Sequence, residues 1–371
     1  MLPNPPSGAL SRVLRRIGVA VLGVALPLTL APQDHTSAAA GPIIPLPGNP
    51  LAAHPWGVYL GPQDMAWEPW TKATGRKKEL LDKIVLQPKA QWYGKWVADR
   101  DIADRIHKLV ASATGGDPDV MVQMAIFRMV PWEGNDRVCN RLPTTAEVAS
   151  YKKWVRNAAA AIGSTYVAMI LQPDGPFALC AKNGSKLPSR MIRYAAKTFS
   201  ANPNTTIYID AGAADWNRSN PKTALKILMP AGISMVRGFA FNSTHYDSVA
   251  EEVDYGAAVA QALAEKGILD KHFVVNTSSN GQPFRGYTYK GPDFDNAYTC
   301  QDKTQHHCVT LGIPPTTDVA NPAWGLTLGQ RLKAAAYADG YLWFGRPWLF
   351  DQASPFVMKR ALTLARTTPW Q

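Results

Sequence analysis

The feature that most constrains the fold is a regular alternation of strand-like and helix-like segments along most of the 371-residue chain. Short runs of apolar, β-branched and aromatic residues predict strands, and longer segments with apolar residues every three or four positions predict helices. The strand-like runs lie at 56–60, 91–96, 120–129, 166–172, 206–211, 238–242, 273–277 and 341–344, and the helix-like segments at about 99–113, 144–162, 187–201, 247–267 and 354–366. Such alternation with short links predicts an α/β fold with a parallel sheet covered by helices, most economically one closed β/α barrel.

Local signals define the expected domain. Thr144-Thr-Ala-Glu147 has the form of a capping box that opens a helix. No internal repeat or long linker divides the chain, so we expect a single catalytic domain over 56–371, preceded by an extended leader at 41–55 that is rich in Pro, Gly and Ala. The long irregular stretch 278–330 is unusual in a compact domain, and loops of this kind are often functional.

The N-terminus resembles an export signal. Three arginines precede an apolar run at 17–31, and small residues follow at 37–40. The run is too short for a comfortable transmembrane helix. We therefore expect residues 1–40 to be a signal peptide and the protein to be secreted or associated with the cell envelope, without stable membrane insertion. The pair Arg15-Arg16 leaves the export route open between the general and the twin-arginine pathway.

The net charge of +11 raises the question of a polyanionic partner. The basic residues are scattered along the sequence rather than clustered, which argues against nucleic acid. Ordinary solubility and attraction to an anionic cell envelope both remain compatible with the charge. The sequence contains no Gly-rich phosphate loop, no Ser-His-Asp pattern and no His-Glu-x-x-His motif. We expect a monomer that uses no cofactor.

Four cysteines in an exported protein indicate two disulfides more often than a metal site. Sequence alone allows about three pairings. We favour Cys139–Cys180 and Cys300–Cys308. The alternative, a metal site that recruits His306 and the neighbouring His307 with a cysteine, is disfavoured by the oxidising compartment and by the lack of a Cys-x-x-Cys spacing.

Polar and aromatic residues follow the predicted strands at their carboxyl ends, which meet at one site in a parallel barrel. Carboxylates and amides bind hydroxyl groups, and aromatic faces stack on the C–H surfaces of sugars. Asp174 lies where α/β barrels place an acid catalyst. The set therefore predicts a polyhydroxylated substrate, and its members are Trp92, Gln172, Asp174, Asp210, Asn242, Asn276, Arg346 and Asp351.

Nine segments occur in the order in which glycoside hydrolase family 6 carries similar motifs. They are Asn49-Pro-Leu-Ala, Gln91-Trp92, Asp136-Arg137-Val138-Cys139, Gln172-Pro173-Asp174, Tyr208-Ile-Asp210-Ala-Gly212 with Trp216, Arg237-Gly-Phe239 with Asn242, Asn276-Thr-Ser-Ser-Asn280-Gly281, Leu311-Gly-Ile-Pro-Pro-Thr-Thr317, and Tyr341-Leu-Trp343 with Arg346-Pro347 and Asp351. From about residue 49 to its end the chain thus resembles the cellobiohydrolases and endoglucanases that cut β-1,4-glucans.

The resemblance implies a distorted parallel β/α barrel, a variant of the TIM barrel, and an inverting glycosidase. It implies that Asp174 is the general acid and that Asp351 is a candidate base. Each also has a plain structural interpretation, because Asp174 suits a turn and Asp351 suits a helix N-cap. The residues that the resemblance assigns to sugar binding are Trp92, Asp210, Trp216, Asn242, Asn276, Asn280, Trp343 and Arg346.

Several positions depart from the family pattern and leave the substrate open. Val138 replaces the aspartate that keeps the acid protonated, which removes a like-charge interaction. A second function, glycan binding on an inactive hydrolase scaffold, therefore stands beside hydrolysis of cellulose or of another β-glycan. The choice between internal and chain-end cleavage is also open. The remaining departures are Ala213 for histidine, Ser279 for arginine, Asn276 for aspartate, Gly345 for lysine and Leu349 for glutamate.

Overall fold

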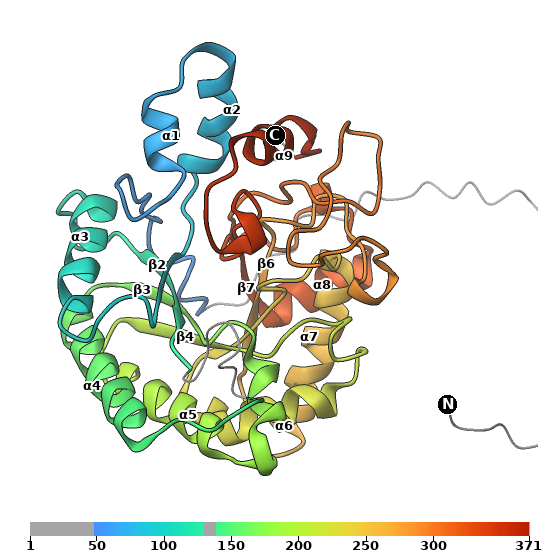
Figure 1. Cartoon of the computed structure of the whole chain (residues 1–371). Coiled ribbons are helices and arrows are strands. Elements are labelled where there is room, and N and C mark those ends of the chain that lie inside the picture. The colour runs from blue at the N-terminus through green and yellow to red at the C-terminus, as the bar shows by residue number, and fades with distance from the viewer. Residues whose placement is uncertain (1–47, 130–138, 371) are drawn as a thin grey trace, which may run out of the picture. The chain divides into compact units, whose positions relative to one another are not determined.

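The computed structural model describes residues 48–129 and 139–370, and these residues form a curled parallel sheet surrounded by helices (Figure 1). The strands are β1 Gln91–Gly94, β2 Val122–Phe127, β3 Val167–Leu171, β4 Thr205–Asp210, β5 Gly238–Phe241, β6 His272–Asn276 and β7 Ala338–Leu342. The helices are α1 Trp67–Thr71, α2 Gly75–Val85, α3 Ile102–Thr114, α4 Thr145–Ile162, α5 Leu187–Phe199, α6 Pro221–Ala231, α7 Val249–Ala264, α8 Leu328–Tyr337 and α9 Met358–Thr367.

The seven strands of the described chain pair in sequence order, and every pairing is parallel. The sheet does not close fully. Within the described part of the chain, one bridge, between Lys89 and Trp343, joins the entry to β1 with the exit from β7, and there the Ala90 amide donates to the Trp343 carbonyl at 2.8 Å. The α/β barrel that we predicted is confirmed, but as a curled sheet with a seam between β1 and β7 rather than a closed cylinder.

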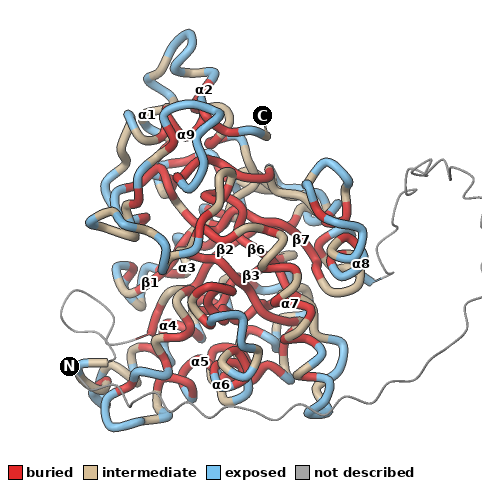
Figure 2. The backbone as a smooth tube through the Cα atoms, turned by 90° about the vertical axis from the view of Figure 1, so that its right-hand side faces the viewer, coloured by how far each residue is buried: buried red, intermediate tan, exposed pale blue. Residues whose placement is uncertain are grey.

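Side chains alternate between two packing layers along each strand, as the period of two requires. In β3, Ala168 and Ile170 face the inside of the barrel, where they pack with Tyr208. Met169 and Leu171 face the helices and join the largest core cluster. Figure 2 shows the resulting continuous buried layer along the strands.

The predicted capping box is present at the start of α4. The Thr144 hydroxyl accepts from the Glu147 amide at 3.2 Å, and the Glu147 carboxylate accepts from the Thr144 amide at 2.8 Å. A bidentate ion pair with Arg141 lowers the pKa of Glu147 to about 2, although burial works in the opposite direction. The helix start is therefore held by backbone and charged contacts together.

A buried ion-pair network lies near the amino ends of the strands. Asp339 at the start of β7 accepts from Arg237 Nε at 2.8 Å and from the Tyr208 hydroxyl at 2.6 Å. The backbone of Asp339 also accepts from the Asn49 amide group at 2.7 Å, and Leu51 is fully buried. The described end of the predicted leader is thus packed on the domain, and the boundary at residue 56 stays a prediction.

Two further predictions from the sequence have outcomes in the fold. The disulfides Cys139–Cys180 and Cys300–Cys308 are both present, which leaves Cys308 unable to act as a metal ligand. The run 56–60 is not a strand, because Trp56 makes only an isolated bridge with Met121. A search of the described residues for a helix of transmembrane length and hydropathy finds none.

Candidate active site

The carboxyl ends of the strands surround a cleft of about 400 Å³. Asp174 follows β3, Thr244 and His245 follow β5, and the loop after β7 contributes two charged groups. The long segment 278–330, which the sequence indicated as functional, adds Phe294 and Asp295. The lining consists of Trp92, Phe127, Asp174, Phe177, Trp216, Thr244, His245, Phe294, Asp295, Arg346, Asp351, Gln352 and Ala353. The structure thus brings together the predicted Asp174, Asp351, Trp92, Trp216 and Arg346.

Asp174 is half-buried and has an unusual backbone conformation. Its φ is 61°, and that of Gln172 is 59°, so two non-glycine residues within three positions adopt the left-handed region. Residues held in this region cluster at functional sites, because the surrounding structure must compensate for their strain. The Thr244 hydroxyl donates to Asp174 Oδ1 at 2.8 Å, which fixes the rotation of the carboxyl group.

Asp210 lies directly behind Asp174 and is fully buried. Its carboxylate accepts from the backbone amides of Gly175 and Gly212, both at 3.0 Å, and from the Ser243 hydroxyl. A Cβ atom at Gly175 would lie 2.1 Å from the Asp210 carbonyl, so only glycine permits this approach. Burial raises the pKa of Asp210 to about 8, the charge of Asp174 adds to the shift, and the three hydrogen bonds oppose it. Asp210 therefore supports the Asp174 turn from behind and does not line the cleft.

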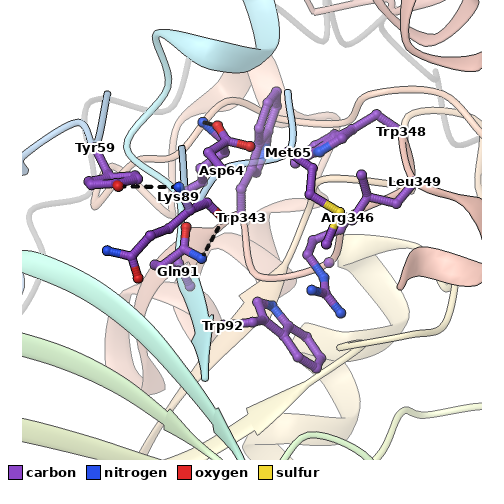
Figure 3. A pocket seen from close by; sticks show the side chains of 13 residues that line it. Tyr59, Asp64, Met65, Lys89, Gln91, Trp92, Trp343, Arg346, Trp348 and Leu349 are labelled. Atoms are coloured by element: carbon purple, nitrogen blue, oxygen red, sulfur yellow. Dashed lines mark hydrogen bonds and ion pairs between the residues drawn. The ribbon is translucent and has the colours of Figure 1, made fainter. Parts of the chain in front are cut away.

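Trp92 and Arg346 form the wall of the cleft beside the β1–β7 seam, and both also line a smaller neighbouring pocket, which Figure 3 shows. The guanidinium carbon of Arg346 lies 4.1 Å from the centre of the Trp92 ring, and the Trp92 indole donates to the Phe344 carbonyl at 2.7 Å. Burial lowers the pKa of Arg346 to about 9, while the charge of Asp174 opposes the shift. Arg346 thus carries a positive charge at neutral pH next to both the aromatic wall and Asp174.

Asp351 lies on the same loop after β7 as Arg346, in a 3₁₀ turn at Phe350–Gln352, with a φ of 48°. Desolvation raises the pKa of Asp351, a hydrogen bond with Asp293 and the charge of Asp295 raise it further, and Arg360 opposes the shift. Asp351 therefore belongs to a group of carboxyls that compete for protons. This surrounding favours a residue that accepts a proton during a reaction.

Comparison with known proteins assigns the family. The sequence model of the family described as "Glycosyl hydrolases family 6" matches residues 62–328. The chain belongs to this family. Membership confirms the predicted family and its enzyme class, the glycoside hydrolases.

Several named members of family 6 resemble the chain. Endoglucanase A of Cellulomonas fimi is 31% identical over 236 residues, which are 62% of this chain and 48% of that protein. Endoglucanase 1 of Streptomyces halstedii is 28% identical over 283 residues, 75% of this chain and 82% of that protein. The chain thus spans about half the length of the first of these relatives.

Solved family 6 structures share the fold. The endoglucanase of Mycobacterium tuberculosis, solved with methyl-cellobiosyl-4-deoxy-4-thio-β-D-cellobioside, superposes with a TM-score of 0.67 at 23% identity and covers 86% of this chain and 99% of its own. A family 6 enzyme of Orpinomyces superposes with a TM-score of 0.63 at 18% identity, covering 87% and 99% of the two chains. At these identities the likeness concerns the fold.

Five residues with predicted sugar-binding roles do not line the cleft, namely Asp210, described above, and the four that follow. Trp343 is 0% exposed and its indole donates to the Ile313 carbonyl at 2.8 Å. Asn242 and Asn276 are also 0% exposed and hydrogen-bond each other's backbone carbonyls, at 3.1 and 3.0 Å. Asn280 is 6% exposed and donates to the Asp247 carbonyl at 2.8 Å. These four side chains brace the strand ends, and the sugar-binding roles that the family resemblance suggested for them stay predictions.

Sequence reasoning missed Thr244 and His245. His245 stacks on Trp216, with ring centroids 4.7 Å apart and planes 16° apart, and its Nδ1 lies 2.7 Å from Asp215 Oδ1. Both residues lie two and three positions after Asn242, the last residue of a motif at the end of β5. Their roles depend on Asp174 and Asp215, which follow other strands, so no local pattern shows them.

The departures from the family pattern are part of one packing arrangement. A Cβ atom at Gly345 would lie 2.6 Å from Asn276 Nδ2 and 2.7 Å from Ser278 Oγ, so no larger side chain fits there. Leu349 is 2% exposed and Ser279 is 0% exposed, so neither presents a group to the cleft. Val138 lies outside the described residues. The chain therefore differs from the family pattern at positions where the side chains of Ser279 and Leu349 are buried and Gly345 is crowded by its neighbours.

Proposed function

We propose that this chain is an inverting β-glycosidase that cleaves β-1,4-glucan or a related β-glycan, with Asp174 as general acid and Asp351 as base. The observation that carries the proposal is that both carboxyls line one cleft of about 400 Å³ whose walls are aromatic. Family membership supports the reaction class. The β-1,4-glucan substrate is supported by the endoglucanase relatives and by the probable 1,4-β-D-glucan cellobiohydrolase C of Aspergillus terreus, which is 25% identical over 249 residues.

In the proposed reaction, Asp174 donates its proton to the glycosidic oxygen as the bond to the anomeric carbon breaks. A water molecule attacks that carbon from the opposite face and loses a proton to Asp351. Asp174 loses one proton and Asp351 gains one, so the protonation of the site as a whole is unchanged. The product has the inverted configuration at the anomeric carbon. Thr244 fixes the orientation of the acid, and Asp351 can accept the proton because its surroundings raise its pKa.

Substrate binding in this proposal relies on the aromatic side chains that line the cleft and on the positive charge of Arg346. Trp92 presents a ring that Arg346 and the Phe344 carbonyl hold in place. Trp216 lines the same cleft. Aromatic rings on both sides suit the C–H faces of consecutive sugar units.

The decisive experiment is release of reducing ends from a panel of β-glucans and bacterial envelope glycans. The wild type should hydrolyse at least one of them, and proton NMR of the first product should show the inverted anomer. Asp174→Asn should lower turnover by at least about a hundredfold, in line with the loss of a general acid. Glycan binding without release, unchanged in Asp174→Asn, would instead establish the glycan-binding function.

We also propose that residues 1–40 direct export and that the mature protein acts outside the cytoplasm as a monomer. Expression with and without residues 1–40, followed by fractionation and by light scattering of the purified protein, tests both points. The protein should leave the cytoplasm only when residues 1–40 are present.

A further inference from the structure

The catalytic cleft continues past Trp216 into a second cleft of about 450 Å³. The two share Trp216, His245 and Phe294, and the second adds Tyr287 and Tyr289 from the long segment 278–330. A chain of sugar units that leaves the catalytic cleft on this side must pass these shared residues.

His245 is held on three sides at this junction. One face of its ring lies on the Trp216 indole at 4.7 Å, and the ring meets Phe294 edge-on at 4.9 Å. Its Nδ1 lies 2.7 Å from Asp215 Oδ1, and its side chain is 14% exposed. The imidazole therefore has one fixed orientation and covers part of the Trp216 ring.

Asp215 is an anchor for this orientation. Its side chain is 1% exposed, and it accepts from the backbone amides of Trp216, at 2.6 Å, and Gly286. Burial works to raise the pKa of Asp215, but the contact with His245 and the two amides outweigh it and lower the pKa. Asp215 is thus a carboxylate, so the proton of a neutral imidazole resides on Nδ1 and Nε2 is an acceptor.

We propose that His245, oriented by Asp215, is a substrate-binding residue that accepts a hydrogen bond from a sugar hydroxyl where the two clefts meet. Among the described residues, none forms a hydrogen bond with Nε2 of His245. A nitrogen held this rigidly in an aromatic wall distinguishes substrates by their hydroxyl groups. A sugar without a hydroxyl at this position would leave the nitrogen without a hydrogen bond. The ligand class is a neutral sugar unit of a β-glycan, so the inference rests on the proposed function.

A purely structural role is the alternative, since the same contacts could serve only to brace the loop after β5. His245→Phe separates the two possibilities. Phenylalanine keeps the ring that packs on Trp216 and Phe294 but has neither nitrogen. If the nitrogens bind sugar, KM for a long cello-oligosaccharide should rise about tenfold, the value of one hydrogen bond, with kcat changed less than about threefold. The melting temperature should stay close to that of the wild type.

His54→Phe is a matched control. His54 also stacks on an aromatic ring, Tyr166, at 3.6 Å, and its Nδ1 also contacts an oxygen, the Asp119 carbonyl, at 3.1 Å. It lies near the amino ends of β2 and β3, outside the cleft. His54→Phe should leave KM unchanged. Asp215→Asn should raise KM, as His245→Phe does. The KM of the double variant should not exceed the higher of the two single-variant values, because both changes remove the same interaction.

The outcomes separate this inference from the proposed function. Unchanged KM in His245→Phe, with normal hydrolysis, would overturn the inference and leave the proposed function intact. If the wild type binds cello-oligosaccharide in calorimetry but does not cleave it, a tenfold weaker Kd in His245→Phe would support the inference and an equal Kd would overturn it. A wild type that neither cleaves nor binds any glycan of the panel would overturn both.

Discussion

Two aspartates within one site differ in function because their surroundings differ. Asp174 is half-buried and faces the cleft, whereas Asp210 is fully buried and accepts three hydrogen bonds behind it. From the family resemblance the sequence predicts an acid at Asp174 and a different role for Asp210, but it does not show that Asp210 is buried behind Asp174, because burial depends on which side of the strand end each side chain points to. The same limit explains Trp343, whose ring turns outward into the cluster formed by α2 and α9.

The first prediction concerns the orientation of the acid. Thr244→Val removes the hydroxyl that donates to Asp174 Oδ1 but keeps the shape of the side chain. Because the carboxyl loses this restraint, kcat should fall by about three- to tenfold, the value of one hydrogen bond, with little change in melting temperature. Thr198→Val, which removes a comparable hydroxyl bond to the Tyr194 carbonyl on α5, should leave kcat unchanged. Equal kcat values for Thr244→Val and wild type would show that Thr244 does not orient the acid.

A second prediction concerns Asn276, where the family has an aspartate. The amide group of Asn276 donates to the Asn242 carbonyl at 3.0 Å, and its oxygen accepts from the amides of Phe344 and Gly345. Asn276→Asp would place a carboxylate against that carbonyl, so the free energy of unfolding should fall by about 1–3 kcal/mol. Urea denaturation measures this. Asn204→Asp, which loses a similar bond to the Ser164 carbonyl at the surface, should cost much less because water replaces the partner.

At the scale of elements, helices and strands with a clear apolar pattern are predicted well from the sequence, and helices without one are predicted poorly. β3 and α4 have clear apolar patterns, and both occur close to the predicted bounds. α2, α6 and α8 were not predicted. α2 opens with charged residues, α6 begins at Pro221 and contains Pro230, and α8 buries only Arg331 and Ala334. The seam between β1 and β7 was also not predictable, since the number of strands does not fix whether a barrel closes.

The third prediction compares the two disulfides. Cys139–Cys180 spans 41 residues and Cys300–Cys308 spans 8. In the chain-entropy model these loops correspond to about 4 and about 2.5 kcal/mol of stability, so replacing the first pair by serine should lower the melting temperature more than replacing the second. Loss of the first pair should also lower kcat, because Cys180 ends the turn that begins at Asp174. Calorimetry and reducing-sugar assays on both double variants test this, and an equal effect of the two pairs would contradict it.

At the scale of the whole molecule, buried carboxyls dominate the dependence of stability on pH. Burial raises the pKa of Asp210 and of Asp247 to about 8, and raises that of Glu252 well above its usual value. Between about pH 4, where these groups titrate in the unfolded chain, and pH 8, the folded state holds more protons than the unfolded state. The stability that these protons provide is therefore complete below pH 4 and is lost as the pH rises through 8.

Other carboxyls act in the opposite direction at low pH. The pKa values of Glu147 and Asp339 are lowered by arginine partners despite the opposing effect of burial on each, so the stability that they provide is lost below about pH 4. The fourth prediction is a melting temperature that is highest near pH 5 and falls toward pH 8, measured by calorimetry. Asp210→Asn, whose amide can keep the backbone contacts without titrating, should flatten the decline. A melting temperature that rises from pH 5 to pH 8 would contradict the prediction.

The crowding around Gly345 also bears on how this chain can evolve. A lysine at 345 would collide with Asn276 and Ser278. An aspartate at 276, introduced alone, would place a carboxylate against the Asn242 carbonyl. Each single step back toward the usual residues of the family thus passes through a less stable protein. We therefore expect selection that tolerates only one substitution at a time to keep glycine at 345 and asparagine at 276, because the first step toward either residue of the family lowers stability.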